Sequence, residues 1–210
     1  MSHDLKTSLT MIVGYGEMIR DLPGEDNAEN AQVIINEAQR LTSLVNDLLD
    51  FSKVDEIKLN REEVSLNNML KDVYKQYLNN FRSNNVKFEL KLVEDKEICV
   101  DFKRIKQVLY NFLNNAYNYN ESANKQITLG VEKTDDKYRV YVLDNGIGIR
   151  EEDQDKIWDR YYKVDKEHKR SAIGSGIGLS LAKNILEQHG LKYGVDSVYG
   201  EYSKFWFEIM

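Results

Sequence analysis

Several residue types are scarce in this chain of 210 residues, and each scarcity excludes a kind of site. Cys99 is the single cysteine, so an internal disulfide and a cysteine-based zinc site are both excluded. The three histidines stand at positions 3, 168 and 189, too scattered to predict a cluster of metal ligands. No apolar run approaches the ~20 residues that cross a bilayer. Charged side chains within the first ten residues argue against a secretory signal.

Basic residues do not outnumber acidic ones, which bears on the partners of the protein. The sequence holds 29 Lys and Arg against 35 Asp and Glu, a net charge of −6. Such a surface repels phosphate backbones, so we expect no nucleic-acid partner. We expect the chain as given to be cytoplasmic and free of membrane contact. It begins within a predicted helix, so we also expect it to come from a longer protein.

Apolar spacing predicts a helical hairpin over residues 1–58. A helix is expected over 3–22, a turn over 21–27 and a longer helix over about 28–56. Because two helices cannot close a core around a 3.5-residue apolar seam, we expect a homodimeric four-helix bundle. The alternative is that the hairpin packs on its own globular domain. The seam residues are Ile34, Ala38, Leu41, Val45 and Leu48.

The remainder, residues 62–210, predicts a second domain of mixed helices and strands. Asp101 is expected to begin a helix that runs to about 118, because its carboxylate can cap the free amides at 103 or 104. Strands with helices over one face give an α/β sandwich, so the whole chain is assigned to the α+β class. The other expected helices are 66–82 and 177–189, and the expected strands lie near 86–92, 127–131, 138–143, 191–196 and 202–209.

Polar residues in this domain form local clusters with defined chemistry. Asn111 and Asn115 lie one helical turn apart, so their amide oxygens share a face and suit Mg²⁺, which binds nucleotide phosphates. Asp144 ends an apolar strand, where it can accept a hydrogen bond from an exocyclic amine while the following glycines admit a flat ring. A glycine triplet over 174–178 precedes a helix whose free amides favour an anion. Taken singly, the asparagines favour a solvated helix face, Asp144 favours an ordinary strand-ending turn, and the glycine triplet is weak evidence.

The order of the clusters carries more information than any one of them. SHDLKTSLT at 2–10 is followed by NFLNNAYNY at 111–119, DNGIGI at 144–149, IWDRYYKVD at 157–165 and GSGIGL at 174–179. In this order, over nearly the whole chain, the sequence resembles the sensor histidine kinases, with their H, N, first Gly, F and second Gly boxes. The ATP-binding half also resembles DNA gyrase, a heat-shock chaperone family and mismatch-repair ATPases, which lack the histidine-bearing hairpin.

The resemblance implies a dimerisation and phosphotransfer hairpin over 1–58 and a Bergerat-type ATP-binding fold over 62–210. It implies autophosphorylation of His3 by ATP with Mg²⁺, then transfer to an aspartate in the receiver domain of a response regulator. Asp4 would orient the imidazole or take its proton. Thr7 would position water for removing phosphate from the regulator. The longer protein is then expected to be a membrane receptor with this part in the cytoplasm.

The resemblance also implies which residues contact the nucleotide. Asn115 would ligate Mg²⁺, with Asn111 supporting the metal or the phosphates. Asp144 would bind the adenine amine, and Tyr119 would stack near the base. The other implied residues shape the pocket, hinge the lid or neutralise phosphate charge: Gly146, Gly148, Arg160, Lys163, Gly174, Gly176, Gly178 and Leu179.

Two positions depart from the family pattern. The H box commonly has proline where this chain has Ser8, so we expect a straighter and stiffer first helix. The N box often has lysine where this chain has Asn118, which removes a cation near the phosphates unless a lid lysine substitutes for it. Only two residues precede His3, so we expect its helical turn to fray and the dimer seam to be shortened.

Two other functions fit parts of the pattern. A nucleotide-binding pseudokinase that signals through the hairpin would share the fold, but intact His3, Asn115 and Asp144 argue against it. A clamp ATPase of the gyrase or chaperone type would use a glutamate one turn before the metal-binding asparagine, and Asn111 occupies that place. We therefore expect an active protein-histidine kinase.

Overall fold

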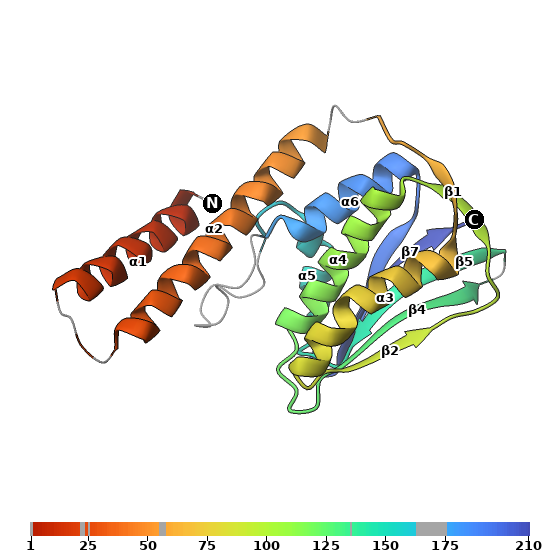
Figure 1. Cartoon of the computed structure of the whole chain (residues 1–210). Helices are drawn as coiled ribbons and strands as arrows, with labels where there is room; N and C mark the ends of the chain where they lie inside the picture. The colour runs from red at the N-terminus through yellow and green to blue at the C-terminus, as the bar shows by residue number, and fades with distance from the viewer. Residues whose placement is uncertain (1, 22–23, 25, 55–57, 135, 163–175) are drawn as a thin grey trace. The chain divides into compact units, whose positions relative to one another are not determined.

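A computed structural model gives the fold of the chain (Figure 1). It describes residues 2–21, 24, 26–54, 58–134, 136–162 and 176–210, apart from the side chains at 2–5, 40, 43–44 and 46–54. The chain divides into two compact units, Met1–Asp55 and Glu56–Met210. Among the described helices, none has both the length and the apolar character needed to cross a membrane.

The first unit is a hairpin of two helices, α1 (Ser2–Asp21) and α2 (Asn27–Val54), which pack against each other. Gly16 of α1 faces α2, because a Cβ in its place would make an ordinary contact of 4.0 Å with Ile34 Cδ1. Helix α1 continues unbroken through Ser8, at the position where a proline would have removed a hydrogen bond. The predicted helical hairpin is confirmed.

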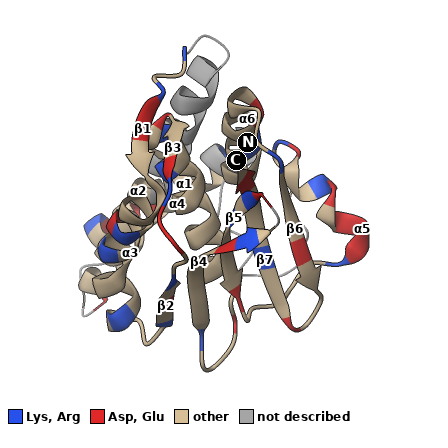
Figure 2. Ribbon diagram, turned by 90° about the vertical axis from the view of Figure 1, so that its right-hand side faces the viewer, with Lys and Arg blue, Asp and Glu red and all other residues tan. Residues whose placement is uncertain are grey.

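The second unit is built on a sheet whose described strands are β2 (Lys87–Lys91), β4 (Gln126–Thr134), β5 (Lys137–Asp144), β6 (Tyr193–Val198) and β7 (Tyr202–Ile209). Their order across the sheet is β2-β4-β5-β7-β6 (Figure 2). Strand β2 pairs in parallel with β4, whereas the β4–β5, β5–β7 and β7–β6 pairs are antiparallel. The crossover from β2 to β4 places a long helix, and with it the asparagines predicted to bind the nucleotide, on one face of the sheet.

That face is covered by α3 (Leu66–Ser83), α4 (Phe102–Asn118) and α6 (Gly178–His189), as Figure 1 shows. Phe112 of α4 is fully buried, and its ring centre lies 5.4 Å from that of Phe205 on β7. Helices over one face of a mixed sheet confirm the predicted α+β class and the α/β layering of the second domain.

The opposite face of the sheet is polar but carries flat aromatic rings. The guanidinium of Arg139 lies 4.0 Å from the ring centre of Trp206, and Lys204 Nζ lies 4.4 Å from that of Tyr141. Arg139 also forms an ion pair of 2.7 Å with Glu208. The cations therefore cover the rings and are themselves neutralised, which keeps this face compatible with water.

Some short elements were not predicted from the sequence. Strands β1 (Glu62–Ser65) and β3 (Glu97–Val100) form a separate antiparallel pair. A four-residue helix, α5 (Glu151–Gln154), is followed by a 3₁₀ turn, η1 (Lys156–Trp158). Elements of three or four residues contain too few positions to show a periodicity, so pattern alone cannot detect them.

Helix α4 begins where the sequence predicts, because an Asp101 carboxylate oxygen accepts a hydrogen bond of 3.1 Å from the Arg104 amide. The second oxygen accepts from the Asn60 amide at 3.0 Å, and the Asp101 amide donates to His189 Nε2 at 3.0 Å. His189 Nδ1 lies 2.7 Å from the Ile185 carbonyl oxygen, so the ring is neutral with its proton on Nδ1. We call this cluster of Asn60, Asp101 and His189 the helix-end joint, since it ties the start of α4 to the end of α6.

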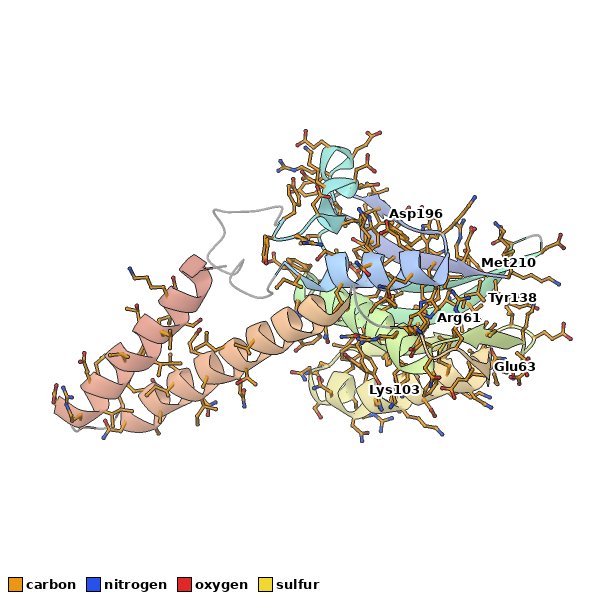
Figure 3. The ribbon with its side chains drawn as sticks, turned by 90° about the horizontal axis from the view of Figure 1, so that it is seen from above. Arg61, Glu63, Lys103, Tyr138, Asp196 and Met210 are labelled. Carbon is orange, nitrogen blue, oxygen red and sulfur yellow. The ribbon has the colours of Figure 1, made fainter. Side chains whose placement is uncertain are left out.

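Arg61 adds a charge to the helix-end joint. Its Nη2 donates to the carbonyl oxygens of Gln188 and His189, both at 3.3 Å. Figure 3 labels Arg61 beside the C-terminal end of α6, where a cation opposes the negative end of the helix dipole. The residues that follow the first unit are thus bound to the ends of both α4 and α6.

Acid is expected to weaken the helix-end joint. Burial lowers the pKa of His189 below its ordinary value of 6.5, and only the neutral ring accepts from Asp101. As the pH falls below 6.5 the unfolded chain takes up a proton that the folded chain refuses, so the free energy of unfolding should fall. His189→Asn should flatten this dependence and, at pH 8, lower the stability by about 1–3 kcal/mol.

Urea unfolding at pH 5, 6, 7 and 8 measures the effect through tryptophan fluorescence, because Trp158 and Trp206, the two tryptophans of the chain, both belong to the second unit. The wild type and His189→Asn share all other titrating groups, so the difference between their pH profiles reports the contribution of His189. Parallel pH profiles for the wild type and His189→Asn would contradict the assignment.

Candidate functional site

The predicted nucleotide-binding residues that the structure describes lie along the C-terminal half of α4 and the segments beside it. Asn111 and Asn115 are half-buried one turn apart on α4. A Cβ on Gly178, the first residue of α6, would stand 3.2 Å from Asn111 Oδ1. The Asn111 Nδ2 atom is buried and has no hydrogen-bond partner within the described part of the chain. A buried amide donor without a partner suits an anionic ligand oxygen.

Asp144 lies at the other end of this half of α4. Its carboxylate is buried, and Oδ1 accepts a hydrogen bond of 2.8 Å from the Gly146 amide. A Cβ on Gly146 would stand 2.6 Å from the Tyr119 carbonyl oxygen and 2.7 Å from Asp144 Oδ1. Gly146 is therefore required by the packing of the chain itself, beyond any room it leaves for a ring. The structure brings Tyr119, Asp144 and Gly146 together, as the resemblance implied.

Burial raises the pKa of Asp144 to about 7, and the hydrogen bond from Gly146 only partly offsets the loss of solvation. A carboxylate in this position lacks the water that would normally stabilise its charge. A ligand that donates a further hydrogen bond would stabilise the charged form and lower the pKa. This is the electrostatic property expected of a group that recognises an amine.

The loop after β5 is held rigidly on its far side. Gly148 has φ +64°, and a Cβ there would stand 2.1 Å from the Val198 carbonyl oxygen, so only glycine fits. The Gly200 amide donates to the Ile147 carbonyl oxygen at 2.8 Å, and the Ile149 amide donates to Ser197 Oγ at 2.8 Å. The turn between β6 and β7 therefore fixes the loop that carries Asp144.

Tyr161 and Gly176 meet just before the start of α6. The Tyr161 amide donates to the Gly176 carbonyl oxygen at 2.9 Å, and both residues have positive φ, 63° and 69°. Arg160 is exposed next to this contact, and Leu179 lies half-buried in the first turn of α6. Of the predicted lid residues, Lys163 and Gly174 lie outside the described residues.

The two groups of polar residues are separated along one helix. Tyr119 is eight positions after Asn111, which at 1.5 Å per residue corresponds to about 12 Å. At one end stand Asn115 and Asn111, whose Nδ2 has no partner among the described residues, and the buried carboxyl of Asp144 stands at the other. This length and polarity match an elongated ligand with an anionic end and an amine-bearing ring.

A metal site in this pocket would depend on amide oxygens. Among the residues that the structure describes, no three His, Cys, Asp or Glu side chains are grouped to hold a metal ion. Asn111 and Asn115 supply neutral oxygens on one helix face, a donor set that suits a hard cation carrying its own waters and phosphate ligands. The residues present therefore fit Mg²⁺ brought in with a nucleotide.

The remaining predicted residues belong to the first unit. His3, Asp4 and Thr7 all lie in α1, and Thr7 is exposed four residues after His3. The side chains of His3 and Asp4 are outside the described residues. Residues one turn apart share a helix face, so the backbone places these two predicted functions together.

Sequence reasoning missed two asparagines next to the pocket. Asn120 is 1% exposed, and its Nδ2 donates to Asn145 Oδ1 at 2.9 Å. The only sequence signal was the place of Asn145 between Asp144 and Gly146, since asparagine commonly hydrogen-bonds nearby backbone at turns. Its partners lie about 20 residues upstream, so no local pattern predicts them.

Curated relatives and solved structures resemble this chain over almost its full length. The signal transduction histidine-protein kinase ArlS of Staphylococcus haemolyticus is 32% identical over 97% of this chain and 46% of its own length. Sensor histidine kinase WalK of Bacillus subtilis is 31% identical over 96% of this chain and 34% of its own length. The chain thus spans less than half the length of these relatives.

Among solved structures, histidine kinase ThkA in complex with the response regulator protein TrrA has a TM-score of 0.80. It is 28% identical, over 99% of this chain and 59% of that one. Histidine kinase AdeS of Acinetobacter baumannii has a TM-score of 0.77 at 22% identity, over 99% of this chain and 96% of that one, and it supports the fold.

Family models match two separate parts of the chain. Residues 100–210 match the Histidine kinase-, DNA gyrase B-, and HSP90-like ATPase family, and residues 1–57 match the His Kinase A (phospho-acceptor) domain. The sheet, its helices and the polar pocket therefore define an ATP-binding domain of the histidine kinase, gyrase and HSP90 class. With the phospho-acceptor hairpin before it, the chain belongs to the sensor histidine kinases of two-component systems.

The raised pKa of Asp144 predicts an unusual dependence of stability on pH. Between about pH 4 and pH 7 the folded chain holds a proton that the unfolded chain, with its ordinary pKa of 3.8, has lost. The contribution to the free energy of unfolding is therefore complete at low pH and is lost as the pH rises through about 7. Asp144→Asn removes this titration, so relative to wild type it should gain up to about 4 kcal/mol between pH 4 and pH 8.

Urea unfolding without nucleotide, again followed by tryptophan fluorescence, measures this gain. Asp153→Asn offers a control, because Asp153 is also buried yet its carboxylate accepts from Tyr162 in a different part of the domain. An unchanged pH profile in Asp144→Asn would show that the carboxyl is ionised at neutral pH in the folded protein.

Proposed function

We propose that this chain is the catalytic core of a sensor histidine kinase, which transfers the γ-phosphoryl group of ATP to His3 and then to an aspartate of a response regulator. The hairpin, 1–58, would carry dimerisation and phosphotransfer, and 62–210 would bind the nucleotide. One observation carries the proposal: a phospho-acceptor domain match precedes an ATPase domain whose pocket has a buried carboxyl at one end and an unpartnered amide donor at the other.

The base would occupy the end of the pocket near Asp144. Its carboxylate would accept a hydrogen bond from the exocyclic amine of adenine, and Tyr119, 42% exposed, would stack near the ring. Gly146 and Gly148 would shape this end, since their close contacts fix the loop. Recognition of an amine by an acceptor disfavours guanine, which has a carbonyl oxygen at the corresponding position.

The phosphates would occupy the end near Asn111. Its buried Nδ2 would donate to a phosphate oxygen, and Asn115 would hold Mg²⁺. When bound, Mg²⁺ neutralises charge on the phosphate oxygens and so favours phosphoryl transfer. The first amides of α6, at Gly178 and Leu179, would favour the anion, because they lack partners within the helix. In the lid, Gly174 and Gly176 would act as hinges, and Arg160 and Lys163 would neutralise charge on the phosphates.

At the phospho-acceptor helix, a neutral imidazole nitrogen of His3 would attack the γ-phosphorus. The new N–P bond forms as the P–O bond to the β-phosphate breaks, and ADP leaves with that electron pair. Asp4 would hold the ring or accept its proton, which avoids a build-up of positive charge on the imidazole.

Two partners follow from this function. A receiver domain of a response regulator is supported by the related kinase ThkA, which was solved with its regulator TrrA. A second copy of the chain is supported by apolar side chains left open on the hairpin, where Leu9 and Val13 are 54% and 57% exposed. We also place the chain in the cytoplasm as part of a longer membrane receptor, because ATP and receiver domains are intracellular.

His3 is expected to be the single phosphorylation site. Incubation of the wild type with γ-labelled ATP and Mg²⁺ should label the protein. The label should be lost in acid and stable in base, as expected of phosphohistidine. His3→Ala should lose the label completely, while His168→Ala should keep it. If the first turn of α1 is too short to react, extension of the chain upstream should restore labelling. Persistent label in His3→Ala would rule out His3.

Thr7 is expected to act on the regulator rather than on ATP. Because it lies one turn from His3 on an exposed helix face, it can orient water against a phosphorylated aspartate of the partner. Thr7→Ala should slow dephosphorylation of the regulator by a larger factor than it slows labelling of His3. Thr7→Ser, which keeps the hydroxyl, should dephosphorylate the regulator faster than Thr7→Ala does. The measurement is the rate at which purified phosphorylated regulator loses its phosphate in the presence of each variant, ADP and Mg²⁺. Equal rates for wild type and Thr7→Ala would show that Thr7 does not have this role.

A further inference from the structure

The side chain of Asn145 uses all its hydrogen-bonding capacity on one neighbouring segment. Its Oδ1 accepts from Asn120 Nδ2 at 2.9 Å and from the Gln126 amide at 2.7 Å. Its Nδ2 donates to the Asn124 carbonyl oxygen at 3.0 Å and to Ser122 Oγ at 3.3 Å. A primary amide has two acceptor sites and two N–H donors, so the side chain is fully satisfied by residues 120–126.

This segment begins directly after Tyr119, at the end of α4. Asn120, nearly inaccessible to solvent, turns the segment by accepting from the Ser122 amide at 3.1 Å. The Asn145 backbone also binds this segment, since its amide donates to the Gln126 carbonyl oxygen at 3.3 Å. The backbone of Asp144 is held in the sheet, opposite Ile127 of β4 and Ser203 of β7. Beyond the end of the strand, the side chain of Asn145 supplies most of the hydrogen bonds that fasten the loop after Asp144 to the segment that follows Tyr119.

Asn145 lies close to the two groups whose relative position matters for binding a base, the Asp144 carboxylate and Tyr119. Asp144 immediately precedes Asn145, and Gly146 immediately follows it. The Ile147 amide donates to the Tyr119 carbonyl oxygen at 3.2 Å, so the loop passes directly against Tyr119. A Cβ on Gly146 would come within 2.6 Å of that same oxygen, which leaves no free space between the two segments. A small shift of either segment would therefore change the position of the Asp144 carboxylate relative to Tyr119.

We propose that Asn145 is a positioning residue for the adenine end of the pocket, which sets the Asp144 carboxylate relative to Tyr119 and so determines the preference for adenine over guanine. The inference rests on the proposed function, because it assumes that Asp144 faces the exocyclic amine. Asn145 does not itself touch the base. It acts through the two residues that do.

A positioning role and a merely structural role give different results. If Asn145 only stabilised the fold, its loss would weaken ATP and GTP binding by the same factor. If it positions Asp144, the loss falls mainly on the nucleotide that has the amine, because only that hydrogen bond depends on the carboxylate position. The ratio of ATP to GTP affinity is therefore the informative quantity, and it is insensitive to a uniform change in stability.

The test measures ATP and GTP affinity by calorimetry on the full chain with Mg²⁺, for the wild type, Asn145→Ala, Asn145→Asp and the control Glu121→Ala. Glu121 is exposed in the same segment and forms none of the described bonds to Asn145. Asn145→Ala should weaken ATP binding roughly tenfold or more and GTP binding much less, so the ratio collapses. Asn145→Asp keeps the oxygens that accept from Asn120 and Gln126, and its ratio should lie between those of wild type and Asn145→Ala. The control should keep the wild-type ratio.

A double substitution examines the coupling directly. Asn120→Ala removes one partner of Asn145, so the loss of ATP affinity in Asn120→Ala/Asn145→Ala should be smaller than the product of the single losses. Unfolding followed by tryptophan fluorescence identifies which variants are folded. If Asn145→Ala is not folded, the comparison of wild type with Asn145→Asp tests the proposal.

The possible failures are distinguishable. A wild type that binds neither nucleotide, or binds both equally, would overturn the proposed role of Asp144. A wild type that prefers ATP, with the same preference in Asn145→Ala and Asn145→Asp, would overturn the positioning role while leaving the kinase assignment intact.

Discussion

The packing of α4 on the sheet is the constraint on which the rest of the domain depends. One stripe of this helix, including Ile105, Leu109 and Phe112, is fully buried against β-strands and neighbouring helices. Because side chains recur every 3.6 residues, burial of that stripe fixes the rotation of the helix and leaves Asn111 and Asn115 on an adjacent face. The polar pocket is thus a direct consequence of apolar packing. A helix that rolled by one residue would bury its amides and expose its core.

The largest elements were predictable because each has a long, regular pattern. Alternation along β5 and β7 and the helical spacing of α4 extend over eight or more residues, and Asp101 marks the start of α4 by its capping chemistry. The predicted sheet face, helix cover and α+β class follow from those patterns alone. Strands β1 and β3, with four residues each, pair through backbone hydrogen bonds that leave little trace in side-chain composition.

The site was predictable to the extent that its residues are adjacent in the chain. Asp144 and Gly146 belong to one motif, and the structure brings them together with Tyr119 as expected. The fastening of Asn145 to Asn120, and of His189 to Asp101, joins residues 25 and 88 positions apart. Contacts of this kind depend on how the helices fold back over the sheet, which a single sequence does not specify locally. For the same reason the buried, unpartnered Nδ2 of Asn111 became visible only in three dimensions.

The helix-end joint has a mechanical consequence for the pocket. Helices α4 and α6 meet at Asp101 and His189, while Asn111 and Gly178 face each other farther along the same two helices. The pair is therefore tied by hydrogen bonds at one end, and the residues proposed to bind phosphate lie at the other end. Since Gly178 lies 11 residues from His189, about 17 Å along the axis, a rotation of about 4° at the joint would shift it by roughly 1 Å. Asn60 and Arg61 form hydrogen bonds at the joint itself, so a displacement of residues 60–61 would act on the ends of both helices.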